Sequence, residues 1–261
     1  MTELCSLEGQ TAIVTGGAGN IGSATVRALA SLGAQVMVAD HDGERASAVA
    51  SEVDGALPWA ADVTRPDQVD AMVARAVSVW GRVDIGVNVV GGGGVNGRTI
   101  LETPDEDWQW GMEHNLYSAI RCCRAYAEAM LSSGVAGSIV NVASPAALRA
   151  APGMAAYGAS KAALINFTWT LAVELGPQGI RCNVVVPAFV PNPRMSWGGS
   201  PEEQAALARR SVPMGRVTRA EDVAGAIVAF ASGLTSFCTG QVVVCDGGRL
   251  LTNPINPGSS G

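Results

Sequence analysis

Two side chains with complementary acid–base chemistry lie four residues apart in the segment Tyr157-Gly-Ala-Ser-Lys161. At this spacing, Tyr157 and Lys161 occupy the same face of a helix. A tyrosine with an ordinary pKa of about 10 is a poor base at neutral pH, but a nearby positive charge favours the phenolate and lowers that pKa. The spacing therefore predicts proton transfer at Tyr157, with Lys161 supplying the charge.

Lys161 is also unusual in composition. The chain has 17 basic residues, and all except Lys161 are arginines. An ammonium is compact, whereas a guanidinium is broad and planar. Position 161 is therefore expected to require an ammonium, although an ordinary pair of side chains on a helix surface is the alternative interpretation of the motif.

Ser144 ends the run Ser138-Ile-Val-Asn-Val-Ala-Ser144, which is predicted to form a buried strand. Open α/β sheets bind ligands at the carboxyl ends of their strands. A hydroxyl at that place can hold a substrate oxygen and stabilise charge that develops on it. Taken alone, Ser144 also fits a turn at the end of a strand.

A glycine-rich turn follows the first apolar run, in the segment Thr15-Gly-Gly-Ala-Gly-Asn-Ile-Gly22, and opens directly into a predicted helix. Glycines let the backbone approach a pyrophosphate closely, and the helix N-terminus supplies N–H donors to it. A turn of this kind alone can be only a turn. The residues predicted to bind a pyrophosphate here are Gly16, Gly19, Asn20, Ile21 and Gly22.

Asp40 ends the second predicted strand, about 20 residues beyond the glycine-rich turn, where a carboxylate can bind the adenosine ribose hydroxyls of a dinucleotide. The same carboxylate would repel a 2′-phosphate, and the nearest cation is Arg45. The pattern therefore favours NAD over NADP, with a simple turn acid as the alternative. Asp62 and Val63 follow the third strand and are predicted to lie beside the adenine ring, although Asp62 also fits the cap of a turn.

Short apolar runs alternate along the chain with segments of helical period. The predicted strands are 11–15, 35–39, 57–60, 85–90, 138–142, 181–186 and 241–244. The predicted helices are 21–32, 44–51, 66–79, 104–132, 154–174 and 220–232. Strands separated by helices require right-handed crossovers, which predicts a doubly wound α/β fold of the Rossmann type: a mostly parallel seven-stranded sheet with helices on both faces.

One domain is expected over residues 1–251, followed by a flexible tail over 252–261 that is rich in Pro, Gly and Ser. The proline-rich stretch 187–213 interrupts the helix–strand pattern just after the sixth strand, and it is predicted to be a substrate loop.

Composition excludes several classes of protein. The net charge of −6 and the absence of a basic patch argue against nucleic acid as a partner. No apolar run is long enough for a membrane span, and the first residues do not resemble a secretory signal, so a cytoplasmic location is expected. The six cysteines form no CxxC pair and have no histidine at metal-ligand spacing, so neither a metal site nor a disulfide framework is predicted.

With these motifs in place, the sequence resembles the short-chain dehydrogenase/reductase family from about Leu7 to Gly248. The resemblance adds Asn115, in Glu113-His-Asn-Leu116, to the catalytic group of Ser144, Tyr157 and Lys161. It implies that Tyr157 exchanges the substrate proton and that Lys161 lowers the pKa of Tyr157 and holds the nicotinamide ribose. It also implies that Ser144 orients the carbonyl group and that Asn115 anchors a water relay.

The resemblance assigns further cofactor contacts to four residues. Asn88 and Gly91 are expected on the adenosine side, and Pro187 and Val190 near the nicotinamide. Several positions depart from the family pattern. Asn20 stands at the middle glycine of the turn, and because Asn is the non-glycine residue that best tolerates positive φ, cofactor binding is expected to survive. The other departures are Val89, Ala188 and Asn192.

Together these features predict an NAD(H)-dependent enzyme that interconverts a secondary alcohol and a ketone. The residues predicted to contact the substrate are mostly apolar, which favours a hydrophobic or cyclic alcohol: Ser144, Tyr157, Phe189, Met195 and Trp197. The C-terminal Cys245-Asp-Gly-Gly248 resembles a tetramer-forming segment, so a homo-oligomer, either a tetramer or a dimer, is expected. The alternatives are an NADPH-dependent ketoreductase of the acyl-carrier-protein or quinone type, and a non-catalytic nucleotide-binding protein.

Overall fold

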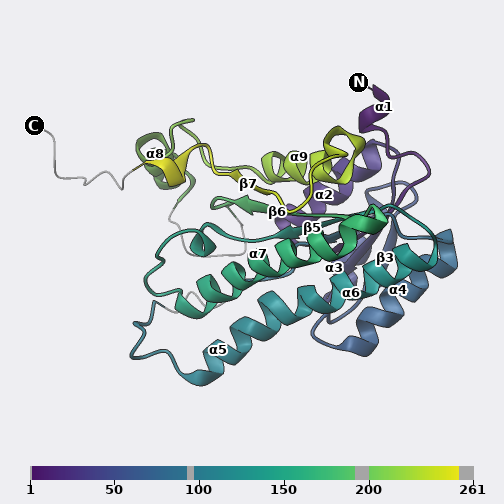
Figure 1. Cartoon of the computed structure of the whole chain (residues 1–261). Helices are drawn as coiled ribbons and strands as arrows, with labels where there is room; N and C mark the ends of the chain where they lie inside the picture. Colours follow the sequence, from purple (N-terminus) through teal and green to yellow (C-terminus); the bar gives the residue numbers. More distant parts are fainter. Residues whose placement is uncertain (1, 93–96, 192–199, 253–261) are drawn as a thin grey trace, which may run out of the picture.

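The computed structural model describes residues 2–92, 97–191 and 200–252. Its centre is a seven-stranded parallel sheet with the strand order β3-β2-β1-β4-β5-β6-β7 (Figure 1). Because the order reverses direction between β1 and β4, a crevice forms at the carboxyl ends of these strands. The strands are β1 (Thr11–Thr15), β2 (Gln35–Asp40), β3 (Leu57–Ala60), β4 (Ile85–Asn88), β5 (Ser138–Val142), β6 (Arg181–Pro187) and β7 (Val242–Cys245).

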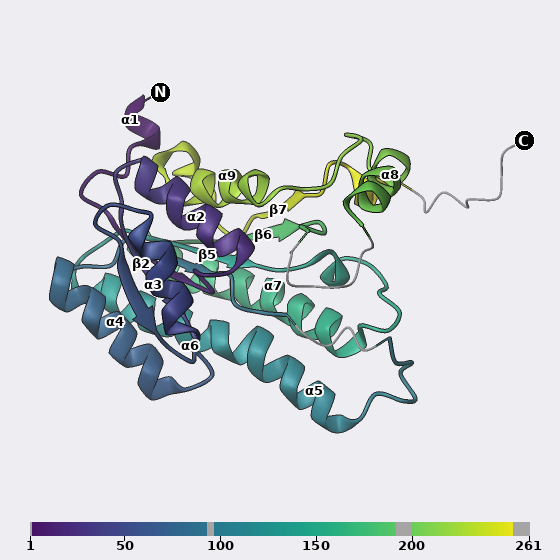
Figure 2. The same ribbon diagram turned by 180° about the vertical axis from the view of Figure 1, so that it is seen from behind.

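Helices cover both faces of the sheet (Figure 1 and Figure 2). One face carries α2 (Asn20–Ser31), α3 (Gly43–Ser51) and α9 (Ala220–Ala231), and the other carries α4 (Pro66–Trp80), α6 (Ser118–Ser132) and α7 (Ala155–Leu175). Side chains alternate along each strand. Ala12 and Val14 of β1 therefore pack under α2 and α9, whereas Ile13 packs towards α4 and α6.

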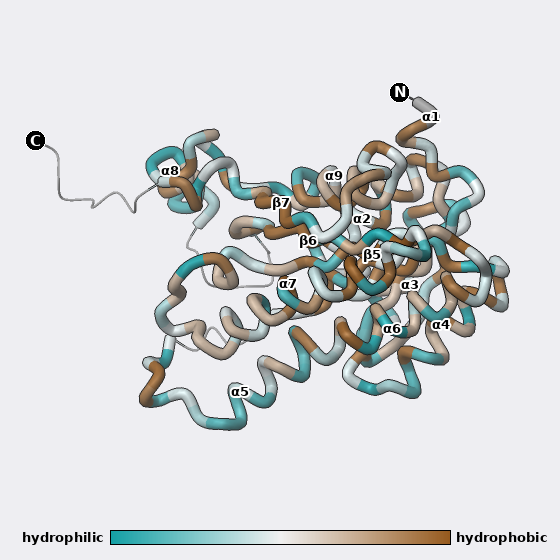
Figure 3. Tube along the Cα trace, viewed as in Figure 1, coloured by the Kyte–Doolittle hydropathy of each residue, from teal (hydrophilic) through white to brown (hydrophobic). Residues whose placement is uncertain are grey.

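Both layers are apolar where they meet the sheet, and Figure 3 shows hydrophobic residues around β6 and β7. All five residues of β1 and all five of β5 are buried. This explains why the strands are apolar throughout instead of alternating in polarity. Within the described part of the chain, no helix combines the length and hydropathy of a membrane span.

The predicted strands and helices are all present, and their ends differ by a residue or two from the prediction. Two predictions need correction. The stretch predicted as a loop contains helix α8 (Pro201–Ser211), which begins with a capping box between Ser200 and Glu203. The single helix predicted over 104–132 consists of α5 (Asp105–Met112), a π-helical turn (Glu113–Tyr117) and α6. The short helix α1 (Thr2–Cys5) was also not predicted.

Candidate active site

A cavity of about 670 Å³ lies at the carboxyl ends of β4, β5 and β6. It receives side chains from the glycine-rich turn, from the segments that follow these three strands and from the first turns of α7. Of the residues predicted to bind cofactor or substrate, those that line it are Ile21, Gly91, Ser144, Tyr157, Lys161, Pro187, Phe189 and Val190. The topology thus gathers predicted site residues that are far apart in sequence.

Ser144 and Tyr157 form the polar centre of this cavity. Ser144 follows β5 and caps the short helix Pro145–Ala147, since its hydroxyl accepts a hydrogen bond from the Ala146 N–H at 3.3 Å. Tyr157 lies in the first turn of α7. Burial raises the pKa of Tyr157, and a hydrogen bond with Ser144 opposes that rise. The protein's own side chains therefore favour a neutral phenol, whereas the sequence led us to expect a lowered pKa.

Lys161 lies one turn further along α7, as predicted, and is only 2% exposed. Its Nζ donates a hydrogen bond to the Val142 carbonyl at 2.9 Å, which holds the ammonium at the end of β5. Burial lowers the pKa of Lys161 to about 8. Because an ammonium in a desolvated site attracts anionic groups strongly, this lysine can stabilise a developing phenolate.

Gly91 is the point where Lys161 and Asn115 meet. A Cβ placed on Gly91 would lie 2.5 Å from Lys161 Nζ and 2.8 Å from Asn115 Oδ1. The φ of Gly91 is +147°, which also favours glycine. Any larger residue at this position would push apart two side chains that were predicted to be catalytic.

Asn115 is fully buried in the π-helical turn between α5 and α6. Its Oδ1 accepts a hydrogen bond from the Gly92 N–H at 2.9 Å, and its Nδ2 donates to the Gly111 carbonyl at 3.0 Å. Asn115 therefore fixes the backbone that follows β4. π-helical turns inside α-helices are frequent at functional sites, and here the turn faces the wall of the cavity through Gly91 and Gly92.

The glycine-rich turn has the shape that a pyrophosphate requires. Gly16 has a φ of +68°, and a Cβ on Gly22 would overlap the Gly16 carbonyl oxygen. Gly19 is the N-cap of α2 and provides no side-chain cap, so the start of this helix is open to an anion. These residues fit the phosphates of a dinucleotide.

Cofactor binding was expected to survive at Asn20 because Asn tolerates positive φ, but the φ of Asn20 is not positive. No non-glycine residue in the described ranges has a positive φ, and Asn20 is simply the first residue of α2. Its Nδ2 donates to the Pro191 carbonyl at 2.7 Å. The family's middle glycine thus corresponds here to an unstrained helical position, and Asn20 connects the turn to the segment after β6.

Asp40 is 7% exposed and binds the glycine-rich turn directly. Its Oδ2 accepts a hydrogen bond from the Ala18 N–H at 3.1 Å. Its Oδ1 accepts from the Asp42 N–H at 3.2 Å and lies 3.0 Å from His41 Nδ1. Arg45 donates to the Ala18 carbonyl at 2.5 Å, so both polar groups of Ala18 are bound from the β2–α3 side.

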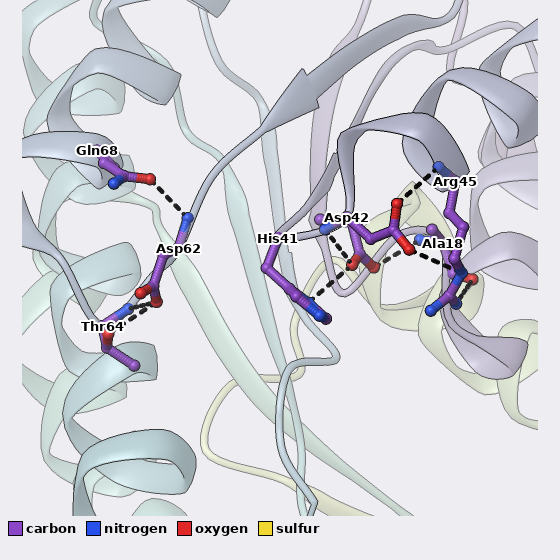
Figure 4. Close-up of polar contacts among 8 residues, drawn as sticks. Ala18, His41, Asp42, Arg45, Asp62, Thr64 and Gln68 are labelled. Carbon is purple, nitrogen blue, oxygen red and sulfur yellow. Dashed lines mark hydrogen bonds and ion pairs between the residues drawn. The ribbon is translucent and has the colours of Figure 1, made fainter.

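Asp62 caps a turn, which was the alternative interpretation of this residue in the sequence. It is exposed, and its carboxylate accepts hydrogen bonds from the Thr64 N–H at 2.9 Å and the Thr64 hydroxyl at 2.7 Å (Figure 4). The bond from the Thr64 hydroxyl is the main reason that the pKa of Asp62 is lowered. Neither Asp62 nor the buried Val63 lines the cavity.

Asn88 is buried between strands rather than directed into the cavity. Its Nδ2 donates to Asn141 Oδ1 at 2.8 Å, and its Oδ1 accepts from the Thr15 hydroxyl at 3.2 Å. These bonds join β1, β4 and β5 at their carboxyl ends. Asn88 therefore positions the backbone at this edge of the sheet, and its side chain does not line the cavity.

Comparison with known proteins agrees with this geometry. The family profile described as enoyl-(acyl carrier protein) reductase matches residues 16–249. The chain belongs to the short-chain dehydrogenase/reductase family. It is 34% identical over 249 residues to the 3-oxoacyl-[acyl-carrier-protein] reductase of Thermotoga maritima, covering 94% of this chain and 99% of that one.

Two further relatives are similar over almost the whole chain. The 2,3-dihydroxy-2,3-dihydro-p-cumate dehydrogenase of Pseudomonas putida is 35% identical, and the match covers 94% of this chain and 96% of that one. The crystal structure of a short-chain type dehydrogenase/reductase from Mycobacterium marinum superposes with a TM-score of 0.84 at 33% identity, covering 95% of this chain and 98% of that one. This member of the short-chain dehydrogenase/reductase family is therefore an oxidoreductase that uses a nicotinamide cofactor.

Three residues that the sequence analysis named lie outside the described ranges, and some residues that line the cavity were not predicted. Met195, Trp197 and Asn192 lie outside the described residues. Arg249 and Leu250 line the cavity, although sequence reasoning did not place them there. They follow β7, and because no local pattern indicates which strands are neighbours, only the order β5-β6-β7 brings them to the site.

Proposed function

We propose that this short-chain dehydrogenase/reductase transfers a hydride between NAD(H) and a secondary alcohol or ketone with a hydrophobic or cyclic body. The observation that carries the proposal is that Ser144, Tyr157 and Lys161 line one cavity, with the Ser144 hydroxyl close enough to Tyr157 to oppose the rise of its pKa. A protein that only bound the nucleotide would have no need of this Ser/Tyr pair. The remaining walls are mainly apolar, which suits a hydrocarbon substrate.

The residues of the chain manage the proton and the developing charge. The nicotinamide, when bound, supplies or accepts the hydride. In the reducing direction, the neutral Tyr157 donates its hydroxyl proton to the carbonyl oxygen, while Ser144 holds that oxygen by a hydrogen bond. In the oxidising direction, Tyr157 takes the alcohol proton, and the ammonium of Lys161 favours the phenolate that must first form.

Lys161 and Asn115 complete the proposed catalytic group, and each has a different role in it. Lys161 is held by the Val142 carbonyl beside Gly91, where an ammonium can also donate to ribose hydroxyls. Asn115 fixes the Gly91–Gly92 backbone, so its role in this proposal is to position the wall of the cavity. The water relay that the family resemblance implies for Asn115 remains part of the proposal.

NAD is the proposed cofactor because Asp40 lies buried against the glycine-rich turn. A carboxylate at this place accepts hydrogen bonds from ribose hydroxyls and repels a 2′-phosphate. The second candidate is an NADPH-dependent reductase of acyl-carrier-protein substrates, which the similarity to the Thermotoga maritima protein favours. Asp40 weighs against this candidate, and the Pseudomonas putida relative, by its name, acts on a cyclic diol.

We also propose that the enzyme is a cytoplasmic homo-oligomer. All six cysteines are free, as a reducing compartment requires. Large apolar side chains are exposed on α7 and β7, including Trp169, Val173, Val243 and Val244. Trp169 and Val173 lie four residues apart and therefore on the same face of α7. Exposed apolar side chains are typical of surfaces that bind another chain.

The proposal is tested by following NADH formation with a panel of steroid, terpene, aryl and hydroxyacid alcohols, using the parent enzyme and Tyr157→Phe. The variant keeps the aromatic ring but has no transferable proton, so turnover should fall at least about a thousandfold. NADH binding should stay nearly unchanged. Tyr117→Phe is the matched control, because Tyr117 is half-exposed and does not line the cavity. Turnover by Tyr157→Phe within about tenfold of the parent would contradict the assignment of the proton donor.

A further inference from the structure

Two arginines, Arg149 and Arg249, line the same cavity as Tyr157. Arg149 follows the short helix Pro145–Ala147 after β5, and Arg249 begins the short helix Arg249–Leu251 after β7. Parallel strands end at the same edge of a sheet, so the two segments meet there although they are far apart in sequence. Arg149 is exposed, and Arg249 is half-buried.

Neither guanidinium forms an ion pair or a side-chain hydrogen bond with a residue that the structure describes. Elsewhere in the chain, Arg82, Arg121 and Arg216 each bind a carboxylate directly. The two arginines of the cavity are therefore available to a ligand, in a protein whose net charge is negative.

The other charged groups in the wall are already engaged. Among the described residues of the lining, Asp246 is the one acid. Its two oxygens accept hydrogen bonds from the Gly248 N–H at 2.8 Å and the Leu250 N–H at 2.6 Å. Lys161 donates to the Val142 carbonyl. Asp246 thus holds the segment that carries Arg249, and it does not neutralise the guanidinium by direct pairing.

The rest of this part of the wall is apolar and includes Ala146, Ala151, Met154, Phe189 and Leu250. Hydride transfer from a neutral alcohol, or to a neutral ketone, needs no cation in such a wall. A guanidinium binds a carboxylate through two parallel charge-assisted hydrogen bonds. We infer that the substrate is a secondary alcohol or ketone with an apolar body and a carboxylate, which Arg149 and Arg249 bind; this inference rests on the proposed function.

The test compares each of three hydroxyacids with its methyl ester: β-hydroxybutyrate, mandelate and 4-hydroxycyclohexanecarboxylate. The pairs differ in charge but hardly in shape, and their carboxylates lie at different distances from the hydroxyl group. The enzymes are the parent, Arg149→Gln, Arg249→Gln and the control Arg75→Gln, which removes a charge from an exposed position on α4 outside the cavity. The readouts are kcat and KM with NAD, and the Kd of NADH.

In the parent, we expect kcat/KM for at least one acid to exceed that of its ester by about tenfold or more, as one charge-assisted hydrogen bond provides. Each cavity variant should lower this ratio by about tenfold, mainly through KM, whereas Arg75→Gln leaves it unchanged. The Kd of NADH should be unchanged in all variants. If the Kd of NADH rises as much as KM, the arginines bind the cofactor instead and the inference is wrong.

Failure of the inference differs from failure of the proposed function. If the parent oxidises every ester as well as the matching acid, the carboxylate inference is overturned and the dehydrogenase function stands. If nothing is oxidised, the proposed function fails, and binding of the corresponding ketoacids and ketoesters to the NADH complex of the parent decides the inference. Tighter binding of the acids, lost in the cavity variants, supports the inference, and equal binding overturns it.

Discussion

Replacing Lys161 by methionine should stabilise the folded protein while it abolishes turnover. Lys161 is 2% exposed, and burial lowers its pKa from 10.5 to about 8. At about 1.36 kcal/mol per pKa unit, this fall corresponds to a cost of about 3 kcal/mol for keeping the ammonium in the folded state at neutral pH. Methionine has a similar length and carries no charge, so the variant avoids this cost.

The variant also loses a favourable contact. Lys161 Nζ donates to the Val142 carbonyl at 2.9 Å, and a charged hydrogen bond of this kind contributes about 1.5 to 3 kcal/mol. Desolvation alone lowers the pKa to about 8, so the loss of this hydrogen bond offsets part of the gain from removing the charge. Set against the cost of about 3 kcal/mol, this loss leaves an expected net gain in the free energy of unfolding at neutral pH of up to about 1.5 kcal/mol.

The pH dependence distinguishes this cause from better packing. Between about pH 8 and pH 10.5, Lys161 is neutral in the folded protein and still protonated in the unfolded chain. The unfolded state then binds more protons, so the stability of the parent rises with pH on account of this residue. Methionine does not titrate. The advantage of Lys161→Met should therefore be full below about pH 8 and shrink towards pH 10.5.

The assay is urea unfolding of the parent and Lys161→Met at several pH values from neutral to about pH 10, without cofactor. Other titrating groups are common to both proteins and cancel in the difference. Lys161→Arg is the control, because it keeps a buried cation that does not titrate in this range. A variant that is less stable than the parent at neutral pH, or an advantage that does not change with pH, would refute the reasoning.

Three further predictions concern the cofactor side of the site. Asp40→Ala should reduce the preference of kcat/KM for NAD over NADP by about tenfold or more, since it removes both an acceptor for the ribose and a repulsive charge; an unchanged ratio would show that Asp40 is only a turn acid. His41→Ala should lower the Kd of NADH by about threefold, because His41 Nδ1, whose side chain is 80% exposed, occupies Asp40 Oδ1 and competes with the ribose hydroxyls. Calorimetric titration checks this, and a weaker affinity would mean that His41 contacts the cofactor. Gly91→Ala should lower kcat at least about a hundredfold, because the alanine Cβ would lie 2.5 Å from Lys161 Nζ. Steady-state assays measure this, and a near-normal kcat would mean that the turn after β4 is free to move.

Local patterns in the sequence were sufficient for most elements of the fold. A parallel sheet buried on both faces requires continuous apolar strands, and the crossover helices carry their own period, so β1 to β7 and the helices between them were visible without tertiary information. The glycine-rich turn and the i, i+4 pair of Tyr157 and Lys161 are equally local. Helix α8 was missed because Pro201 suggested a loop, although Ser200 and Glu203 form a capping box that the sequence already contains.

The π-helical turn and the conformation of Asn20 could not be predicted from local sequence patterns. The sequence of the segment Glu113–Tyr117 is compatible with an ordinary helix, and the turn is recognised only with Asn115 bonded to Gly92 of the β4 segment. Asn20 replaces a family glycine, yet it needs no special backbone because it begins α2 and bonds to Pro191. In both cases, the partner that determines the geometry is distant in sequence.

The sequence by itself thus determined the fold class, the glycine-rich turn and the identity of the Tyr157–Lys161 pair, because each depends on residues within a few positions of one another. Only the tertiary structure decided the environment of these groups. Burial by distant segments raises the pKa of Tyr157 and lowers that of Lys161, and the order β5-β6-β7 brings Arg249 to the cavity. Desolvation and charge arise from everything that packs around a group, so they are properties of the folded chain and not of any short segment of it.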